Sequence, residues 1–257
     1  MNISRSPARL LICGISILVV VLSGCQPEPV FDDWTIDILY NENRSVVVQT
    51  FTNVRPDPGS IENEREREQY QKWLCDDQSD TFQREWKTYA DQLGMQSLEF
   101  RSIEVQSAER GHCDISIQGS KRGWLAPATV FTKLLRSDSY VIQRRDDKFE
   151  LDIDPSEVPE KFVLEVNLWL SEQFPGRLIE ANTPVYDSNP SEIRIGFHEF
   201  WPSKTEKPIK WRRARWNSET LRRDGIQFSF AGPIIHGTQY PIGRDNRPTR
   251  FPRGNNQ

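Results

Sequence analysis

The chain has 257 residues, of which 36% are hydrophobic and 27% are charged, and its formal net charge at pH 7 is −4. This length allows one large domain or two small ones. Beyond residue 24 no apolar run approaches the length of a membrane-spanning helix, which excludes a multi-spanning membrane protein.

The first 24 residues have the pattern of a secretory signal peptide. Arg5 and Arg9 precede an apolar run over residues 10–22. As a helix this run would span about 20 Å, less than the roughly 30 Å core of a bilayer. We therefore expect residues 1–24 to be a removable signal rather than a transmembrane segment.

The signal ends in Leu22-Ser23-Gly24-Cys25. This motif resembles the lipobox of bacterial lipoproteins, in which the cysteine thiol is joined to diacylglycerol and the new amino end receives a further fatty acid such as palmitate. The resemblance implies that Cys25 is a membrane anchor, because two or more acyl chains hold a protein stably at a bilayer. Residues 25–33 would be the lipidated N-terminus and a stiff stalk. An ordinary signal peptide with an incidental cysteine is the alternative.

Gln26 follows the predicted lipidation site. In Gram-negative lipoproteins an acidic residue at that position tends to retain the protein at the inner membrane. By this resemblance, glutamine favours the periplasmic face of the outer membrane. We expect a cell-envelope location.

The sequence contains four cysteines. Cys13 would be removed with the signal peptide and Cys25 would be lipidated, so two cysteines remain. The two others, Cys75 and Cys113, predict one disulfide bond, since exported proteins form such bonds. Two unpaired buried thiols are the alternative. Neither cysteine belongs to a CxxC or CxxH pair of the kind found in metal sites, and we expect no metal and no cofactor.

Alternating apolar residues predict a first hairpin over 34–40 and 45–51. Residues 61–93 have helical periodicity, with a break near Ser79, and their aromatic stripe is typical of a core face. The remaining elements are expected in this order: a hairpin over 97–107 and 112–120, a helix over 126–137, a hairpin over 139–153 turning at Asp146-Asp147, the longest strand over 161–171, another strand over 192–201, and weaker strands over 209–216 and 226–232.

These elements predict an α+β fold, in which an antiparallel sheet of successive hairpins has a few helices packed on one side. We place this domain at residues 34–236. Residues 237–257 are expected to form a basic, flexible tail.

Basic residues are concentrated near the C-terminus: residues 204–253 hold twelve Lys/Arg and four Asp/Glu, whereas residues 26–203 hold nineteen and thirty-three. Guanidinium groups bind phosphate and carboxylate, and indoles stack on them. We therefore predict an anion-binding surface. In an exported lipoprotein, lipid headgroups, lipopolysaccharide phosphate or peptidoglycan carboxylates are nearer partners than nucleic acid. Alternatively, these arginines form ion pairs with the acidic residues of the region 26–203. The predicted surface consists of Arg212, Arg213 and Arg215 between Trp211 and Trp216.

No catalytic residue is predicted. In a strand, His112 and Asp114 would share one face while Cys113 points to the other, so no imidazole could activate that thiol. The sequence HEFWP at 198–202 lacks the second histidine of the zinc-protease motif.

The stretch FPGRLIEAN at 174–182 resembles an element of LppM-like lipoprotein domains. Pro175 and Gly176 can form a tight turn, and Asn182 can cap one. A generic turn between two strands is the alternative. The resemblance implies an envelope lipoprotein with a non-enzymatic role.

These patterns together predict a bacterial cell-envelope lipoprotein, anchored through Cys25. We expect its domain to bind an envelope lipid, glycan or protein rather than to catalyse a reaction. A hydrolase of an envelope polymer and an assembly factor are alternatives, so enzymatic activity stays open.

Overall fold

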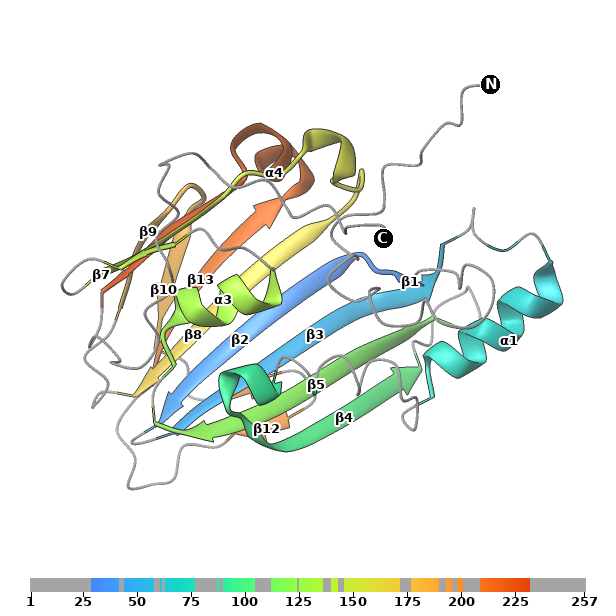
Figure 1. Cartoon of the computed structure of the whole chain (residues 1–257), viewed down its shortest axis with the longest axis horizontal. Helices are drawn as coiled ribbons and strands as arrows, with labels where there is room; N and C mark the ends of the chain where they lie inside the picture. Colours follow the sequence, from blue (N-terminus) through green and yellow to red (C-terminus); the bar gives the residue numbers. More distant parts are fainter. Residues whose placement is uncertain are drawn as a thin grey trace.

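An eight-stranded sheet is the centre of the molecule (Figure 1). The computed structural model describes residues 29–41, 44–57, 61, 63–76, 87, 90–104, 112–123, 125–135, 140–142, 146–171, 177–189, 193–195, 198–200 and 209–231. In spatial order the strands are β10 (Val185–Ser188), β13 (Ile209–Asn217), β8 (Val163–Ser171), β2 (Asp33–Asn41), β3 (Arg44–Pro56), β5 (Cys113–Arg122) and β4 (Gln96–Glu104), and β1 (Pro29–Val30) pairs with the end of β3.

The sheet is mostly antiparallel, as predicted, but its two halves are joined by a parallel pair. The expected hairpins β2–β3 and β4–β5 make one half, and β8, β13 and β10 make the other. Between them, Asp33–Tyr40 of β2 pairs in parallel with Val163–Leu170 of β8. A purely sequential set of hairpins would not contain this contact.

A smaller four-stranded sheet and several helices pack beside the large sheet (Figure 1). No helix in the described residues is both long and apolar enough to cross a membrane. The small sheet contains β6 (Tyr140–Ile142), β7 (Asp146–Leu151), β14 (Ile226–Ala231) and β9 (Arg177–Ala181). Two short strands, β11 (Ile193–Ile195) and β12 (His198–Phe200), pair only with each other. The described helices are α1 (Glu64–Leu74), α3 (Pro127–Leu134), α4 (Ser218–Asp224) and the 3-10 helix η2 (Pro155–Glu157).

Side chains alternate between the two faces of the large sheet. One face, which we call the helix face, carries the buried apolar residues Ile36, Ile38 and Leu168. Apolar side chains from α1, α3 and α4 belong to the same cluster, so the predicted α+β fold with helices on one side is confirmed. The opposite face carries a smaller cluster made of Leu39, Val46, Val48, Trp169 and Ile195.

The helix α4 carries the chain from the large sheet to the small one. Asn217 ends β13 and caps the helix, because its side chain accepts a hydrogen bond from the Thr220 amide (2.9 Å). The helix stops at Gly225, whose φ is +61°. A Cβ atom there would lie 2.2 Å from the carbonyl oxygen of Leu151, so only glycine fits between α4 and the small sheet.

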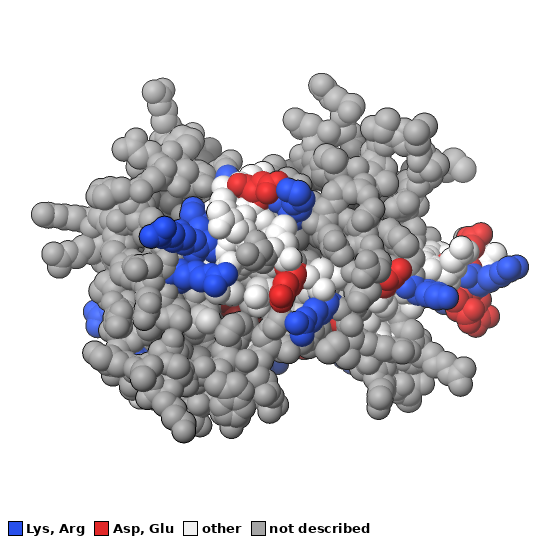
Figure 2. All heavy atoms as spheres, turned by 90° about the horizontal axis from the view of Figure 1, so that it is seen from below, with Lys and Arg blue, Asp and Glu red and all other residues white. Residues whose placement is uncertain are grey.

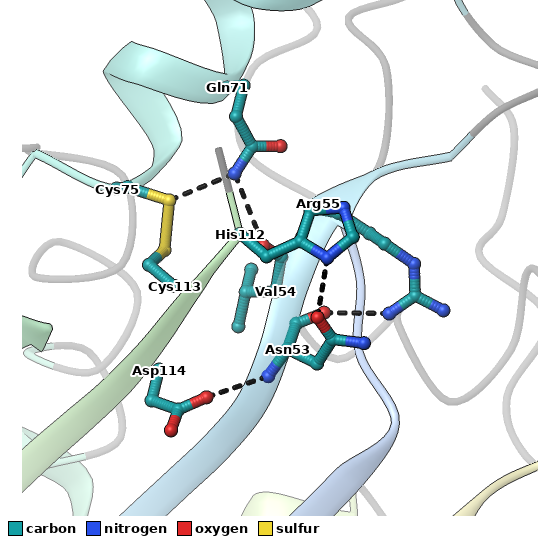
Figure 3. Close-up of a disulfide and its surroundings, with 8 residues drawn as sticks. All are labelled: Asn53, Val54, Arg55, Gln71, Cys75, His112, Cys113 and Asp114. Carbon is teal, nitrogen blue, oxygen red and sulfur yellow. Dashed lines mark hydrogen bonds between the residues drawn. A yellow bond between two sulfur atoms is a disulfide. The ribbon is translucent and has the colours of Figure 1, made fainter. Parts of the chain in front are cut away.

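The predicted disulfide bond between Cys75 and Cys113 is confirmed (Figure 3). It joins the residue after α1 to the first residue of β5, with the two Cα atoms 5.7 Å apart. The amide of Gln71 in α1 donates hydrogen bonds to the Cys75 sulfur (3.0 Å) and to the carbonyl oxygen of Val54 in β3 (3.3 Å). Helix and sheet are therefore tied together by a covalent bond and by hydrogen bonds at one end of the molecule.

The folded part begins at Pro29 rather than at Trp34. Pro29 and Val30 pair with Pro56 and Arg55, and Phe31 is buried in the core. The predicted stalk of residues 25–33 is therefore too long, because the ring of Phe31 packs in the core. The predicted tail at 237–257 and most of the predicted helix over 79–93 lie outside the described residues.

Three finer predictions were wrong. Asp146 and Asp147 begin β7 instead of forming a turn, because both pair with β14. Residues 193–200 form two short paired strands rather than one, with Ile195 opposite His198. The longest strand is β3, with 13 residues, since it continues through polar residues where apolar alternation gives no signal.

Replacing both cysteines, Cys75→Ala with Cys113→Ala, should lower the free energy of unfolding by about 3 to 4 kcal/mol, because the unfolded chain loses a covalent loop constraint. Urea unfolding monitored by tryptophan fluorescence measures this difference. Wild-type protein under reducing conditions is the matched control and should lose a similar amount. A loss below about 1 kcal/mol in both samples would contradict the structural role of the bond.

Candidate functional site

The five residues of the predicted anion-binding surface do not share one face. Arg212 and Trp216 lie on the helix face of β13, whereas Trp211, Arg213 and Arg215 lie on the opposite face, as strand alternation requires. Strand geometry therefore divides the cluster that looked continuous in the sequence.

The two residues on the helix face have structural contacts. Trp216 is fully buried, and its Nε1 donates a hydrogen bond to Oδ1 of Asn182 (2.6 Å). Asn182 in turn donates to the carbonyl oxygens of Asp224 and Gly225, so it ties the end of β9 to the turn after α4. Arg212 forms an ion pair with Asp187 of β10, and burial lowers the pKa of its guanidinium.

Aromatic rings and a guanidinium group form a stack on the opposite face. The Trp169 and Trp211 rings are 5.4 Å apart and nearly parallel. The guanidinium carbon of Arg213 lies 5.0 Å from the centre of the Trp211 ring and 4.8 Å from that of Tyr186. Such contacts fix the orientation of a flexible arginine. Tyr186 is 52% exposed, so the stack reaches the protein surface at β10.

A row of polar side chains runs beside this stack. Nε1 of Trp169 donates a hydrogen bond to Asp37 (2.8 Å), and Nε1 of Trp211 donates to Oδ1 of Asn167 (2.9 Å). The side-chain amide of Asn167 donates to Glu165 (3.0 Å), and Asn167 lies beside Asp37 in the parallel pairing of β8 with β2. Asn167 thus links Trp211 to Glu165, and the bonded pair of Trp169 and Asp37 lies next to it in the same polar network.

Asp37 is the strongly perturbed acid of this network. Its pKa is raised to about 7, chiefly because burial disfavours the charged form, and the negative charge of Glu165 adds to the effect. The hydrogen bond from Trp169 and the neighbouring Asn167 side chain oppose this shift. Near neutral pH the network therefore holds a carboxyl group that can be protonated.

Two arginines share a single carboxylate at the outer end of the network. Oε2 of Glu165 lies 4.0 Å from Nη1 of Arg213 and 4.0 Å from Nε of Arg215. Both separations exceed the length of a hydrogen bond, so the attraction is electrostatic and partly screened. The three groups carry an excess of one positive charge.

Sequence reasoning missed Asp37, Asn167, Trp169 and Tyr186. Each lies on the face of a strand opposite to the apolar residues from which the strand is recognised. The alternation therefore predicts the strand, but it does not indicate that these side chains belong to a site. Only the cross-strand register, Tyr186 to Arg213 to Asn167 to Asp37, brings them together.

The sequence His112-Cys113-Asp114 forms a structural cluster (Figure 3). Cys113 is in the disulfide, while His112 and Asp114 both contact Asn53, at Oδ1 (2.6 Å) and at the backbone amide (2.8 Å) respectively. Within the described residues, no group of three His, Cys, Asp or Glu side chains could hold a metal ion. Cys25 lies outside the described residues.

Other charged residues are distributed in two ways. Figure 2 shows blue and red side chains mixed on α1, at the right of the view, consistent with its alternating glutamates and arginines. At the opposite end of the sheet, Arg44 lies directly across from Arg122, beside the pair Ser45 and Lys121. Arg44 donates to Ser120 and Lys121 to the Leu93 carbonyl, so these two cations have local partners.

The chain matches no protein-family model, and a comparison with curated proteins finds no significant match. Inferences about its function therefore rest on its own sequence and geometry.

The substitution Asp37→Asn should change how stability depends on pH. Because the folded pKa is near 7 and an unfolded aspartate titrates near pH 4, folding favours the protonated acid. Wild-type stability from this group is complete below about pH 4 and is lost as the pH rises to about 7, by at most about 4 kcal/mol. The variant cannot titrate there, so its stability relative to wild type should increase over that range.

Urea unfolding of both proteins at pH values from 4 to 8 measures the effect. Two stability curves that run parallel through this window would contradict the buried, neutral state of Asp37.

Proposed function

We propose that this protein is a bacterial cell-envelope lipoprotein, anchored through Cys25, whose domain binds an anionic envelope component. The lipobox pattern at residues 22–25 supports the anchor. The disulfide between Cys75 and Cys113 fits an exported protein, because such bonds persist in oxidising compartments.

The position of the first strand also supports the anchor. Pro29 begins β1, so three residues, and four Cα-to-Cα steps, separate Cys25 from the folded domain. An extended segment of this length spans at most about 14 Å. A lipid on Cys25 would hold the domain close to the membrane, at the end that carries the disulfide and the end of β3. With Gln26 after the cysteine, the periplasmic face of the outer membrane is the proposed location.

The observation that carries the binding role is the arginine pair on the opposite face of β13. Arg213 is held between two aromatic rings, and Arg215 lies beside it with a single shared carboxylate. Fixing a guanidinium before a ligand arrives lowers the entropy lost on binding. The stretch at 174–182, similar to LppM-like domains, is consistent with this proposal and adds no ligand to it.

A hydrolase of an envelope polymer is the second candidate, and Asp37 is the observation that favours it. A buried acid with a pKa near 7 is typical of a proton donor, and Glu165 provides a second carboxyl group in the same network. If this candidate is correct, Asp37→Asn should abolish the release of soluble fragments from isolated envelope polymer while leaving binding intact.

The substitution Cys25→Ala should leave the protein unlipidated. Growth with an alkyne-labelled fatty acid, followed by fluorescent detection on a gel, measures incorporation. Cys13→Ala is the matched control, since that thiol lies within the signal and should not affect labelling. Equal labelling of wild type and Cys25→Ala would contradict the proposed anchor.

A further inference from the structure

We propose that Arg213, Arg215 and Tyr186 form a binding site for a carboxylate-bearing sugar polymer. This inference names the ligand class of the binding role proposed above and rests on that proposal. The site lies on the opposite face of the large sheet, near the edge formed by β10. It excludes Arg212 and Trp216, which point to the helix face.

The two guanidinium groups are available to a ligand. Among the described residues, neither the Arg213 nor the Arg215 guanidinium group donates a hydrogen bond, and each lies 4.0 Å from its nearest carboxylate oxygen. Their side chains are 29% and 52% exposed. A guanidinium fork binds carboxylate through two parallel hydrogen bonds, and a ligand at this distance could provide them. The excess positive charge selects an anion.

The neighbouring groups suit a sugar as well as an anion. Tyr186 is half exposed beside Arg213, and an aromatic ring offers a flat apolar surface to the apolar face of a sugar ring. Glu165, 19% exposed, offers a carboxylate that can accept hydrogen bonds from hydroxyl or amide groups. Glu165 repels any anion, and it repels a doubly charged phosphate more strongly than a singly charged carboxylate. An inorganic phosphate ion also has no apolar face to place on the tyrosine ring.

The position of the site relative to the anchor favours a polymer over the lipid headgroups of the anchoring membrane. Arg215 lies in register with Glu165, Thr35 and Thr50, whereas Pro29 is opposite Pro56 of the same strand β3. Six residues of strand separate these levels, or about 20 Å. Arg213 is two residues further away. A membrane anchor at Cys25 would therefore leave the site about 20 Å along the strands from the level of Pro29, which favours a ligand that extends beyond the headgroups.

The test uses the purified domain and soluble peptidoglycan strands, which carry free carboxylates on their stem peptides and on those sugars that lack a peptide. Titration calorimetry compares wild type with Arg213→Gln/Arg215→Gln, and the double variant should bind at least about tenfold more weakly. The matched control is Lys210→Gln/Arg223→Gln, which removes the same charge from exposed positions outside the site and should retain wild-type affinity. Tyr186→Ala should also weaken binding, because it removes both the apolar surface for a sugar ring and one of the two rings that hold Arg213.

Two further samples identify the ligand chemistry. Peptidoglycan whose carboxylates have been converted to amides should not bind, and vesicles of phosphatidylglycerol with phosphatidylcholine should bind no better than phosphatidylcholine alone. Stronger binding to the anionic vesicles than to peptidoglycan would overturn the inference in favour of a lipid headgroup. Absence of peptidoglycan binding, or equal loss in the control variant, would also overturn it. Because these experiments use the soluble domain, such a failure would leave the labelling test of Cys25 unaffected.

Discussion

The parallel pairing of β2 with β8 is the contact on which the rest of the molecule depends. It joins residues 33–40 to residues 163–170, which are separated by more than a hundred residues of chain. Each half of the large sheet consists of antiparallel strands. Without the other half, β2 and β8 would each leave one backbone edge unpaired. With the pair formed, Ile36 and Ile38 meet Val166 and Leu168 in a common core. A contact this remote in sequence has a large entropic cost of closure, which the burial of apolar surface on both strands offsets.

The same pairing creates the candidate site. Asp37 comes from one half of the sheet, and Asn167, Trp169 and Glu165 come from the other. Burial of the Asp37 carboxyl group costs free energy unless it is neutral or hydrogen-bonded, and the indole of Trp169 supplies part of that compensation. The acidic region of residues 26–203 and the basic C-terminal region also meet here, since Glu165 lies close to Arg213 and Arg215. Both interpretations of the basic stretch therefore have a structural counterpart: internal pairing for Arg212, and an open, ring-supported pair for the other two.

The local elements were predictable from the sequence, and the contacts between distant elements were not. Alternation over 34–51 specifies a hairpin because a strand with one apolar face needs a partner, and the leftover cysteines specify a bridge. Neither signal states which strand lies on the other side of β2. Asp37 and Asn167 look like solvent-facing residues of half-buried strands, but both are buried, and the indoles that β8 and β13 bring to this face bond to them. The cluster of arginines is visible in the composition of the C-terminal region. Its division between two faces follows from the two-residue alternation of side chains along a strand, which composition does not contain.

Several kinds of contact hold the segment with which the described part of the chain begins. Asn53 has a left-handed backbone, with φ of 55°, within an irregularity of β3, and its side chain bonds to Asp32. Asp32 is also paired with Arg55 at 2.7 Å. The strand β3 is paired with Cys113 at Val54, and the disulfide joins Cys113 to the residue after α1. The short strand β1 pairs with Arg55 and Pro56, directly after Val54. Backbone pairing, the contacts of Asp32 and the covalent bridge to the helix therefore meet at one end of β3, so the first strand of the domain is supported by the best-connected part of that strand.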